Sequence, residues 1–370
     1  MKIGVPKEIK NHEYRVGLTP SSVKEFTNAG HEVFIETSAG SGIGASDEDY
    51  QEAGASILKS AKDIFATAEM IVKVKEPQPV ECEMLEARHL LFTYLHLAPD
   101  PKQTELLLKS GCTAIAYETV TAADGTLPLL TPMSEVAGRM ATIAGVNFLQ
   151  KPHGGEGVLL GGVPGVMPAN VLVIGGGVVG VHAAKMAAGL GANVVILERN
   201  LSRIRHLDEI FSGRVDIVFS NTDTLEKELA RSSLVIGAVL IPGAAAPKLV
   251  SREQLALMPK NAVLVDVAID QGGCFETSHA TTHAEPTFVV DDIIHYCVAN
   301  MPGAYPKTSA HALNNATLPF GLALANKGWR KALQDNAHLR NGLNIHDGKV
   351  TNQPVAEALG YEYISPEDIL

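Results

Sequence analysis

The segment from Val171 to Gly180, VLVIGGGVVG, constrains the fold of this chain more than any other. An apolar strand ends there in closely spaced glycines and opens into the helical segment Val181–Gly189. Gly175 permits a tight turn, Gly177 lets the backbone approach a bound group, and Gly180 lets the helix pack close to the sheet. The free N–H groups at the start of the helix suit a pyrophosphate, so the pattern predicts a dinucleotide site.

The next expected strand, Asn193–Glu198, supports this interpretation because it ends in an acidic residue about 20 residues further on. The Glu198 carboxylate is placed to accept hydrogen bonds from the adenosine ribose and to repel a 2′-phosphate, which favours NAD over NADP. The neighbouring cations Arg199 and Arg203 weaken that preference. The alternative is a glycine-rich turn that only joins a strand to a helix.

Strand-like and helix-like segments alternate along the chain, which predicts parallel sheets covered on both faces. The expected strands of the first third are Lys2–Val5, Glu32–Glu36, Met70–Lys75, Leu90–His96 and Thr113–Glu118. The expected helices there are Pro20–Ala29, Asp47–Ala53 and Lys102–Ser110. A long helix, Pro132 to about Lys151, leads into a second series, whose strands are Asn170–Ile174, Asn193–Glu198, Asp216–Ser220, Leu234–Leu240 and Ala262–Val267.

The length of 370 residues exceeds what one core usually supports, so we expect two domains. Both series predict an α/β fold of the Rossmann-like, doubly wound type. Pro319 is expected to kink or split the helix Ser309–Asn326. The tail Thr351–Leu370 is too thin for its own core, so it should fold back on the first domain and make that domain discontinuous.

Composition excludes several classes of protein. With 46% hydrophobic and 19% charged residues the chain is globular, and a net charge of -11 without a basic cluster argues against a nucleic-acid partner. The four cysteines form no CxxC pair and no histidine pair has zinc-finger spacing, so we expect no metal and a reducing, cytoplasmic location. The first residues lack a signal peptide's apolar region, and no apolar stretch is long enough to span a bilayer.

Ligands of doubly wound sheets bind outside the carboxyl ends of the strands, and two candidate cations lie there. Arg15, between the first strand and helix, could bind a substrate carboxylate with two parallel N–H bonds, or be a solvated loop arginine. Lys75 ends its expected strand and shares a face with Lys73. Two lysines in an apolar strand indicate either a functional ammonium or an edge strand with an outward charged face.

Two candidate acid–base groups lie at other strand ends. His96 ends the strand Leu90–His96, and imidazole suits proton transfer near neutral pH. A hydrogen-bonded core or loop histidine is the alternative. Asp270 follows the strand Ala262–Val267 and precedes a glycine turn, where it could face a nicotinamide and substrate or simply form the turn. Asp266 competes with it but is expected within the strand.

Taken together, these segments resemble the alanine dehydrogenase family, which is related to the NAD-binding subunit of the proton-translocating transhydrogenase. The matching stretches are MKIGVPKEIKNHEYRVGLTP, VKVKEP, LHLAPD, LTPMSEVAGRMA, NVLVIGGGVVG, VDVAIDQGG and YCVANMPGAYPKTS. They extend from residue 1 to about residue 330, and their order and spacing agree with the family.

The resemblance implies reversible oxidative deamination of L-alanine to pyruvate and ammonia, with NAD as hydride acceptor. Arg15 and Lys75 would bind the substrate carboxylate and carbonyl oxygen, and His96 and Asp270 would be the acid–base groups. Besides the glycines of the turn, the NAD site would be lined by Ser134, Val178, Val179, Glu198, Arg203, Ser220, Val239, Leu240, Val267, Ala268, Ile269, Asp270, Val298, Ala299, Asn300 and Met301.

The resemblance also implies an NAD-binding domain, residues 129–305, inserted into a catalytic domain made of residues 1–128 and 306–370, and usually a homohexamer. The family commonly has Asp where this chain has Glu198, and the extra methylene should preserve ribose binding. Some relatives carry Arg at the position of His279, so no NAD contact is assigned there. The alternatives are a transhydrogenase-like NAD-binding subunit, a related dehydrogenase for bulkier amino acids, and a non-catalytic NAD-binding protein.

Overall fold

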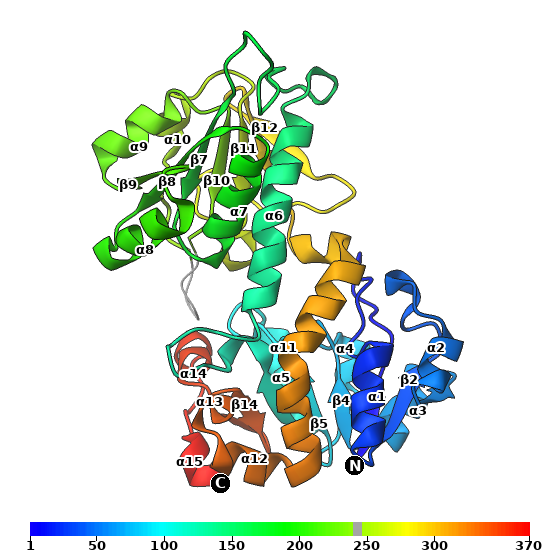
Figure 1. The fold of residues 1–370 in the computed structure, drawn as a ribbon. Coiled ribbons are helices and arrows are strands. Elements are labelled where there is room, and N and C mark those ends of the chain that lie inside the picture. The colour runs from blue at the N-terminus through cyan, green and yellow to red at the C-terminus, as the bar shows by residue number, and fades with distance from the viewer. Residues whose placement is uncertain (240–245) are drawn as a thin grey trace. The chain divides into compact units, whose positions relative to one another are not determined.

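The structure is a computed structural model that describes residues 1–239 and 246–370. The chain forms two compact units (Figure 1). The first unit comprises Met1–Met133 and Gly303–Leu370, and the second comprises Ser134–Pro302. Each unit holds one sheet with helices packed on it, so the predicted α/β class with two doubly wound sheets is confirmed.

The sheet of the first unit has its first strand near the middle, in the order β15-β14-β6-β5-β4-β1-β2-β3. The parallel strands are β1 (Lys2–Val5), β2 (Glu32–Glu36), β3 (Ser56–Leu58), β4 (Met70–Val72), β5 (Leu90–Thr93) and β6 (Thr113–Ala116). From the C-terminal part of the chain, β14 (Leu343–His346) pairs antiparallel with β6, and β15 (Lys349–Val350) pairs antiparallel with β14.

Helices cover both faces of this sheet, and side chains alternate between two cores. One core contains Met70 and Val72 of β4 with helices α1 (Pro20–Asn28) and α11 (Pro306–Lys327). The other contains Ile71 with helices α3 (Ala61–Thr67), α5 (Pro101–Ser110) and α14 (Gln353–Leu359). The remaining helical segments are η1 (Ser41–Ile43), α2 (Asp47–Glu52), α4 (Pro79–Cys82), η2 (Tyr117–Thr119), α12 (Trp329–Asp335), α13 (Ala337–Arg340) and α15 (Pro366–Ile369).

The sheet of the second unit has the order β12-β13-β11-β10-β7-β8-β9, in which the parallel strands are arranged as in the first unit. The parallel strands are β7 (Asn170–Ile174), β8 (Asn193–Glu198), β9 (Asp216–Phe219), β10 (Leu234–Gly237), β11 (Val263–Asp266) and β13 (Ile293–Tyr296), and β12 (Thr287–Val290) is an antiparallel edge strand. When only the parallel strands of each unit are numbered, both sheets follow the order 3-2-1-4-5-6 of dinucleotide-binding folds.

One face of the second sheet packs on α6 (Thr131–Phe148), α7 (Val178–Gly189) and α8 (Leu201–Phe211). The other face packs on α9 (Thr222–Leu229) and α10 (Arg252–Leu255). The short helical segments are η3 (Lys151–His153), η4 (Ile269–Gln271) and η5 (Met301–Ala304), of which η5 extends across the sequence boundary into the first unit.

Some sequence expectations were wrong in detail. The strand expected to end at Lys75 ends at Val72, and the one expected to end at His96 ends at Thr93. In both places a carboxylate from elsewhere in the first unit accepts hydrogen bonds from backbone N–H groups that would otherwise pair with the neighbouring strand. Pro319 does not split its helix, because α11 is continuous and packs on the core on both sides of the proline.

Lys73 is part of a buried charge cluster, and β4 is a central strand, so the edge-strand interpretation was wrong. Its Nζ lies 2.9 Å from Glu8 Oε2 and 2.8 Å from Glu81 Oε1, and all three side chains are buried. The other Glu8 oxygen accepts from the N–H groups of Val74 at 2.7 Å and Lys75 at 3.3 Å. Burial raises the pKa of Glu8, and the Lys73 charge opposes that rise. The cluster therefore fixes the backbone that carries Lys75.

The turn after β7 depends on close backbone packing. Gly175 has φ +106°, a left-handed conformation that favours glycine. A Cβ added at Gly180 would lie 1.9 Å from the carbonyl oxygen of Gly175, whereas one added at Gly189, at the far end of α7, would meet nothing within 4 Å. An alanine at Gly180 would therefore clash with the backbone, whereas an alanine at Gly189 would not.

Gly180→Ala should lower the free energy of unfolding by about 1–3 kcal/mol, because the helix must move away from the turn. Gly189→Ala, the control in the same helix, should leave stability unchanged or slightly raised, since alanine favours helix over glycine. Urea denaturation followed by circular dichroism measures both. Equal stability of the two variants would contradict the close packing at Gly180.

Lys73→Met should cost about 3–5 kcal/mol of stability near neutral pH, because two buried carboxylates lose their cation. The folded-state pKa of Glu8 would then lie further above its unfolded value, so the native state would bind the proton more tightly. The penalty is full above the folded-state pKa of Glu8 and disappears below its unfolded pKa, so the deficit should shrink as the pH is lowered from neutral through the raised pKa of Glu8.

The fluorescence of Trp329, the single tryptophan, reports unfolding of the first unit during urea denaturation. Lys2→Met, which changes an exposed lysine in a strand of the same sheet, is the control and should be nearly neutral. A deficit in Lys73→Met that stays constant with pH would show that the carboxylates do not cause it.

Candidate active site

In each sheet the chain reverses its winding direction between the first strand and the fourth, and ligands of such folds bind outside the carboxyl ends at that point. In the first unit this point lies between β1 and β4, and in the second between β7 and β10. Arg15 lies in the loop that follows β1, and Lys75 follows β4. The glycine turn follows β7, and Val239 follows β10. In each unit taken by itself, candidate residues therefore lie at the point where a ligand is expected.

Arg15 is buried and held by a neighbouring acid, so it is not the solvated loop arginine of the alternative interpretation. Its Nε donates to Glu13 Oε1 at 2.7 Å, its Nη2 to Glu13 Oε2 at 2.5 Å, and its Nη1 to the Met133 sulfur at 3.0 Å. Burial by itself would lower the Arg15 pKa, but the hydrogen bonds and charge of Glu13 outweigh it and raise the pKa. Glu13 thus fixes a permanently charged guanidinium at the switch point.

Lys75 lies in the segment that Glu8 holds, and it pairs with the next residue along the chain. Its Nζ is 3.5 Å from Glu76 Oε2, and Glu76 also forms an ion pair with Lys10. Burial would raise the pKa of Glu76, but the charges of Lys75 and Lys10 outweigh burial and lower it. The carboxylate therefore stays ionised beside the Lys75 ammonium.

His96 has an unusual backbone conformation and a half-buried side chain. Its φ is +51°, a left-handed value that is uncommon for a residue other than glycine. The imidazole stacks on the Tyr94 ring, with centroids 5.8 Å apart and planes 8° from parallel. Side-chain exposure is 38%, so the ring is accessible rather than part of the core. Of the alternative of a core or loop histidine, the core position is therefore wrong, and His96 lies in the loop after β5.

The structure brings Arg15, Lys75 and His96 into one region of the first unit. Tyr94 interacts electrostatically with Arg15 and stacks on His96, while Glu76 interacts with both His96 and Lys75. The acids that hold these groups, Glu8, Glu13, Glu76 and Glu118, were not singled out by the sequence analysis. Glu118 could have been singled out, because it is the last residue of the expected strand Thr113–Glu118, just as His96 is the last residue of the expected strand Leu90–His96.

In the second unit, Glu198 and Arg203 both hold the glycine turn. Glu198 Oε2 accepts from Gly176 N at 2.9 Å, and Glu198 Oε1 accepts from the N–H groups of Arg199 and Asn200 at 2.7 and 2.9 Å. Arg203 Nε donates to Gly176 O at 2.7 Å. A side-chain Cβ at Gly175 or Gly176 would meet neighbouring atoms below 3.0 Å, whereas one at Gly177, the N-cap of α7, would meet none within 4 Å. The turn thus leaves its helix end open, as a bound pyrophosphate requires.

Asp270 is exposed in η4, just beyond β11, and accepts from Asn300 N at 3.3 Å. Asp266, the competing acid, ends β11 and is fully buried. It accepts from Ser278 Oγ at 2.6 Å and from the backbone N–H groups of Ala268 and Phe275. Asp266 therefore shapes the segment that carries Asp270, and Asp270 is the acid available to a ligand.

The other residues expected at the NAD site lie on α6 and α7 or follow the strands of the second sheet. These are Ser134 in α6, Val178 and Val179 in α7, Ser220 after β9, Val239 after β10, Val267, Ala268 and Ile269 after β11, and Val298, Ala299, Asn300 and Met301 after β13. Leu240 lies outside the described residues.

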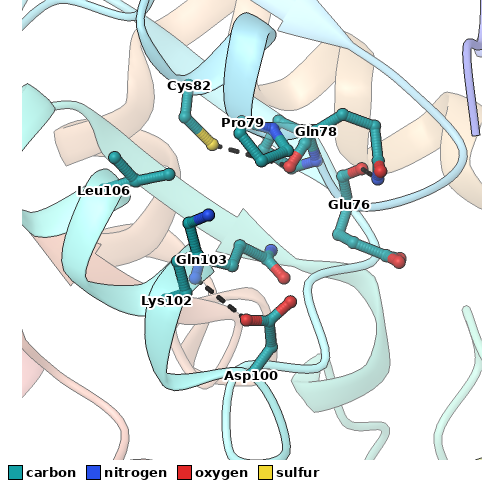
Figure 2. A pocket seen from close by; sticks show the side chains of 9 residues that line it. Glu76, Gln78, Pro79, Cys82, Asp100, Lys102, Gln103 and Leu106 are labelled. Atoms are coloured by element: carbon teal, nitrogen blue, oxygen red, sulfur yellow. Dashed lines mark hydrogen bonds between the residues drawn. The ribbon is translucent and has the colours of Figure 1, made fainter.

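A small cavity opens beside Glu76, between the start of α4 and the start of α5 (Figure 2). Asp100, Lys102 and Gln103 line it from one side and Cys82 from the other. Its volume is ≈ 60 Å³, whereas typical ligand pockets have roughly 300–1,000 Å³. The cavity is therefore too small for a nucleotide or an amino acid.

Within the described residues, no group of three or more His, Cys, Asp or Glu side chains is arranged to hold a metal ion. In the same part of the chain, no helix has the length and apolar character needed to cross a membrane.

Family models match nearly the whole chain. The model described as alanine dehydrogenase/PNT, N-terminal domain, matches residues 4–137, and the corresponding C-terminal domain matches residues 141–353. An alanine dehydrogenase of Halomonas elongata is 58% identical over 370 residues, with all of both chains covered.

Solved structures agree with these matches. A structure named L-alanine dehydrogenase has 52% identity and a TM-score of 0.94, covering 97% of this chain and 99% of the other. A transhydrogenase from Sinorhizobium meliloti has a TM-score of 0.81 with 22% identity, covering 95% of this chain and 99% of the other, which shows a shared fold alone. The predicted family and the prediction of a dehydrogenase are confirmed: the chain belongs to the alanine dehydrogenase/PNT family.

Proposed function

We propose that this chain catalyses the reversible oxidative deamination of L-alanine to pyruvate and ammonia with NAD. The observation that carries the proposal is the set of Arg15, Lys75 and His96 at the carboxyl ends of the first sheet. An amino acid and its keto acid require a fixed cation that binds the carboxylate, an ammonium that stabilises the carbonyl oxygen and an accessible imidazole that transfers protons. The proposal also draws on relatives named alanine dehydrogenase.

In this proposal, residues 129–305 bind NAD and residues 1–128 and 306–370 bind the substrate. The open helix end at Gly177 binds the pyrophosphate, and the Glu198 carboxylate exchanges backbone partners for ribose hydroxyls. The residues that follow β9, β10, β11 and β13, with Ser134, line the remainder of the cofactor site. Bound NAD supplies the acceptor for the hydride of the substrate's α-carbon.

The residues of the chain bind the substrate and move protons. Glu13 binds the Nε and Nη2 edge of Arg15 and fixes the guanidinium, which binds the substrate carboxylate. Lys75 stabilises the oxygen that becomes the ketone. His96 or Asp270 takes a proton from the water that attacks the imino carbon, and returns one to the departing amine.

A cytoplasmic homo-oligomer, a hexamer by resemblance, completes the proposal. The four cysteines, all in the described residues, are buried free thiols, which suits a reducing compartment.

The direct test is loss of NADH absorbance when pyruvate and ammonium are both present. We expect oxidation with pyruvate, much slower oxidation with bulkier 2-oxo acids, and none without ammonium. NADH binding without turnover of any keto acid would instead indicate a non-catalytic NAD-binding protein. Hydride exchange between two nicotinamide dinucleotides without use of pyruvate would indicate a transhydrogenase-like subunit.

His96→Ala should lower kcat by ~10²–10⁴-fold, the usual contribution of an acid–base group, while the Kd for NADH stays unchanged. Steady-state kinetics and fluorescence titration of NADH measure the two effects. His153→Ala, which changes an exposed histidine in η3, is the control and should retain activity. Turnover of His96→Ala near that of the control would remove His96 from the mechanism.

A further inference from the structure

The Glu118 carboxylate binds the backbone that carries His96. Glu118 lies in η2, directly after β6, and its Oε1 accepts from His96 N at 2.6 Å. Both of its oxygens lie 3.2 Å from Leu95 N. The side chain is 15% exposed, so the carboxylate is largely shielded from solvent. These bonds hold the chain at the point where the positive φ of His96 turns it away from the sheet.

The same carboxylate also faces the imidazole. Glu118 Oε1 lies 4.0 Å from His96 Nδ1, about 1 Å longer than a hydrogen bond and within the range of strong charge interaction. The Tyr94 ring, stacked on the imidazole, fixes the plane of the ring. Nδ1 is the ring nitrogen on the side of Glu118, so Nε2 is the nitrogen turned away from that carboxylate. Hydrogen bonds at active sites often tighten only when the substrate binds.

We propose that Glu118 is a positioning residue that keeps a proton on Nδ1 of His96, directs Nε2 to the substrate and stabilises the imidazolium. The inference rests on the proposed role of His96 in alanine deamination. When Nε2 takes the proton of the attacking water, the imidazole becomes a cation with N–H groups at both nitrogens. The ionised Glu118 then accepts the Nδ1–H bond and balances the new charge. The proton returns from Nε2 to the departing amine, so Glu118 itself is never protonated.

Other charged and titratable groups also face His96. Glu76, which follows β4, interacts with the imidazole electrostatically, but Lys75 and Lys10 already neutralise it. Tyr94 is in ring contact, and burial raises its pKa far enough that it stays neutral at physiological pH. Of these groups, Glu118 is the anion that binds the backbone N–H of His96 itself, so its removal should change His96 most.

The decisive variant is Glu118→Gln, which retains an oxygen for the two backbone N–H groups but removes the charge. We expect kcat to fall at least about tenfold while the Kd for NADH is unchanged. A nearby carboxylate raises the pKa of an imidazole, so its removal lowers that pKa. In alanine oxidation the base must be unprotonated, so the acidic limb of the kcat/KM profile should move to lower pH by about one unit.

Two further variants separate positioning from simple support of the fold. Glu118→Asp keeps the charge, so its acidic limb should stay closer to the wild-type position than that of Glu118→Gln. Glu69→Gln is the matched control, because Glu69 also accepts a backbone N–H, from Lys2 at 2.7 Å, at the amino end of the same sheet. Its pH profile should match that of the wild type.

Titration of the His96 ring by NMR on histidine-labelled protein, assigned with His96→Ala, gives a readout independent of turnover. The His96 pKa should be lower in Glu118→Gln than in wild type. An unmoved NMR pKa and an unmoved acidic limb would overturn the inference, even if Glu118→Gln were less active. By contrast, the proposed function would be overturned if the wild type did not oxidise alanine, or if His96→Ala kept wild-type activity. In either case the NMR comparison would still test the interaction between Glu118 and His96.

Discussion

Carboxylate side chains bind the backbone N–H groups at the carboxyl ends of the strands, and the candidate site depends on this interaction. Where a chain turns away from a parallel sheet, its N–H groups lose their ladder partners, and a buried unpaired N–H is costly. Glu8 binds two such groups after β4, Glu118 binds two after β5, and Glu198 binds one in the glycine turn after β7 and two after β8. The positions of the neighbouring functional side chains are thus fixed by these hydrogen bonds to the main chain as well as by packing.

The same carboxylates set the charge of the site. Arg15 is paired with Glu13 and Lys75 with Glu76, so each candidate substrate-binding cation already has an internal counter-ion. A bare buried cation would bind a carboxylate strongly but would itself be costly to desolvate. A paired cation keeps its charge and its geometry, while its attraction for an anionic substrate is moderated. Such moderation suits a reaction that must release a keto acid as readily as it binds one.

The elements that were predicted from sequence are those whose pattern is local. β1, β2, β7 and β8 have the expected bounds because each is an apolar run with a clear stop. β14 and β15 were missed because both are short, because β14 pairs with β6, more than 200 residues away in sequence, and because β15 joins the sheet by pairing with β14. Arg15, Lys75 and His96 were singled out by their place near strand ends. Their acidic partners were not, because an ion pair between distant segments leaves no periodic signal in one sequence.

The two sheets share one strand order and yet differ in what their switch points can bind, because the connection after the first strand differs in length. After β7, three glycines lead directly into α7, and a Cβ at Gly177, the N-cap of that helix, would meet no atom within 4 Å, which leaves the helix end open to a phosphate group. After β1, residues 6–19 intervene before α1 and bring Glu8, Glu13 and Arg15 over the strand ends. That loop fills the crevice with buried charged side chains, which suits recognition of a small substrate by its functional groups. In the proposed function, the length of this loop thus separates a sheet that binds its ligand through the backbone from one that binds through side chains.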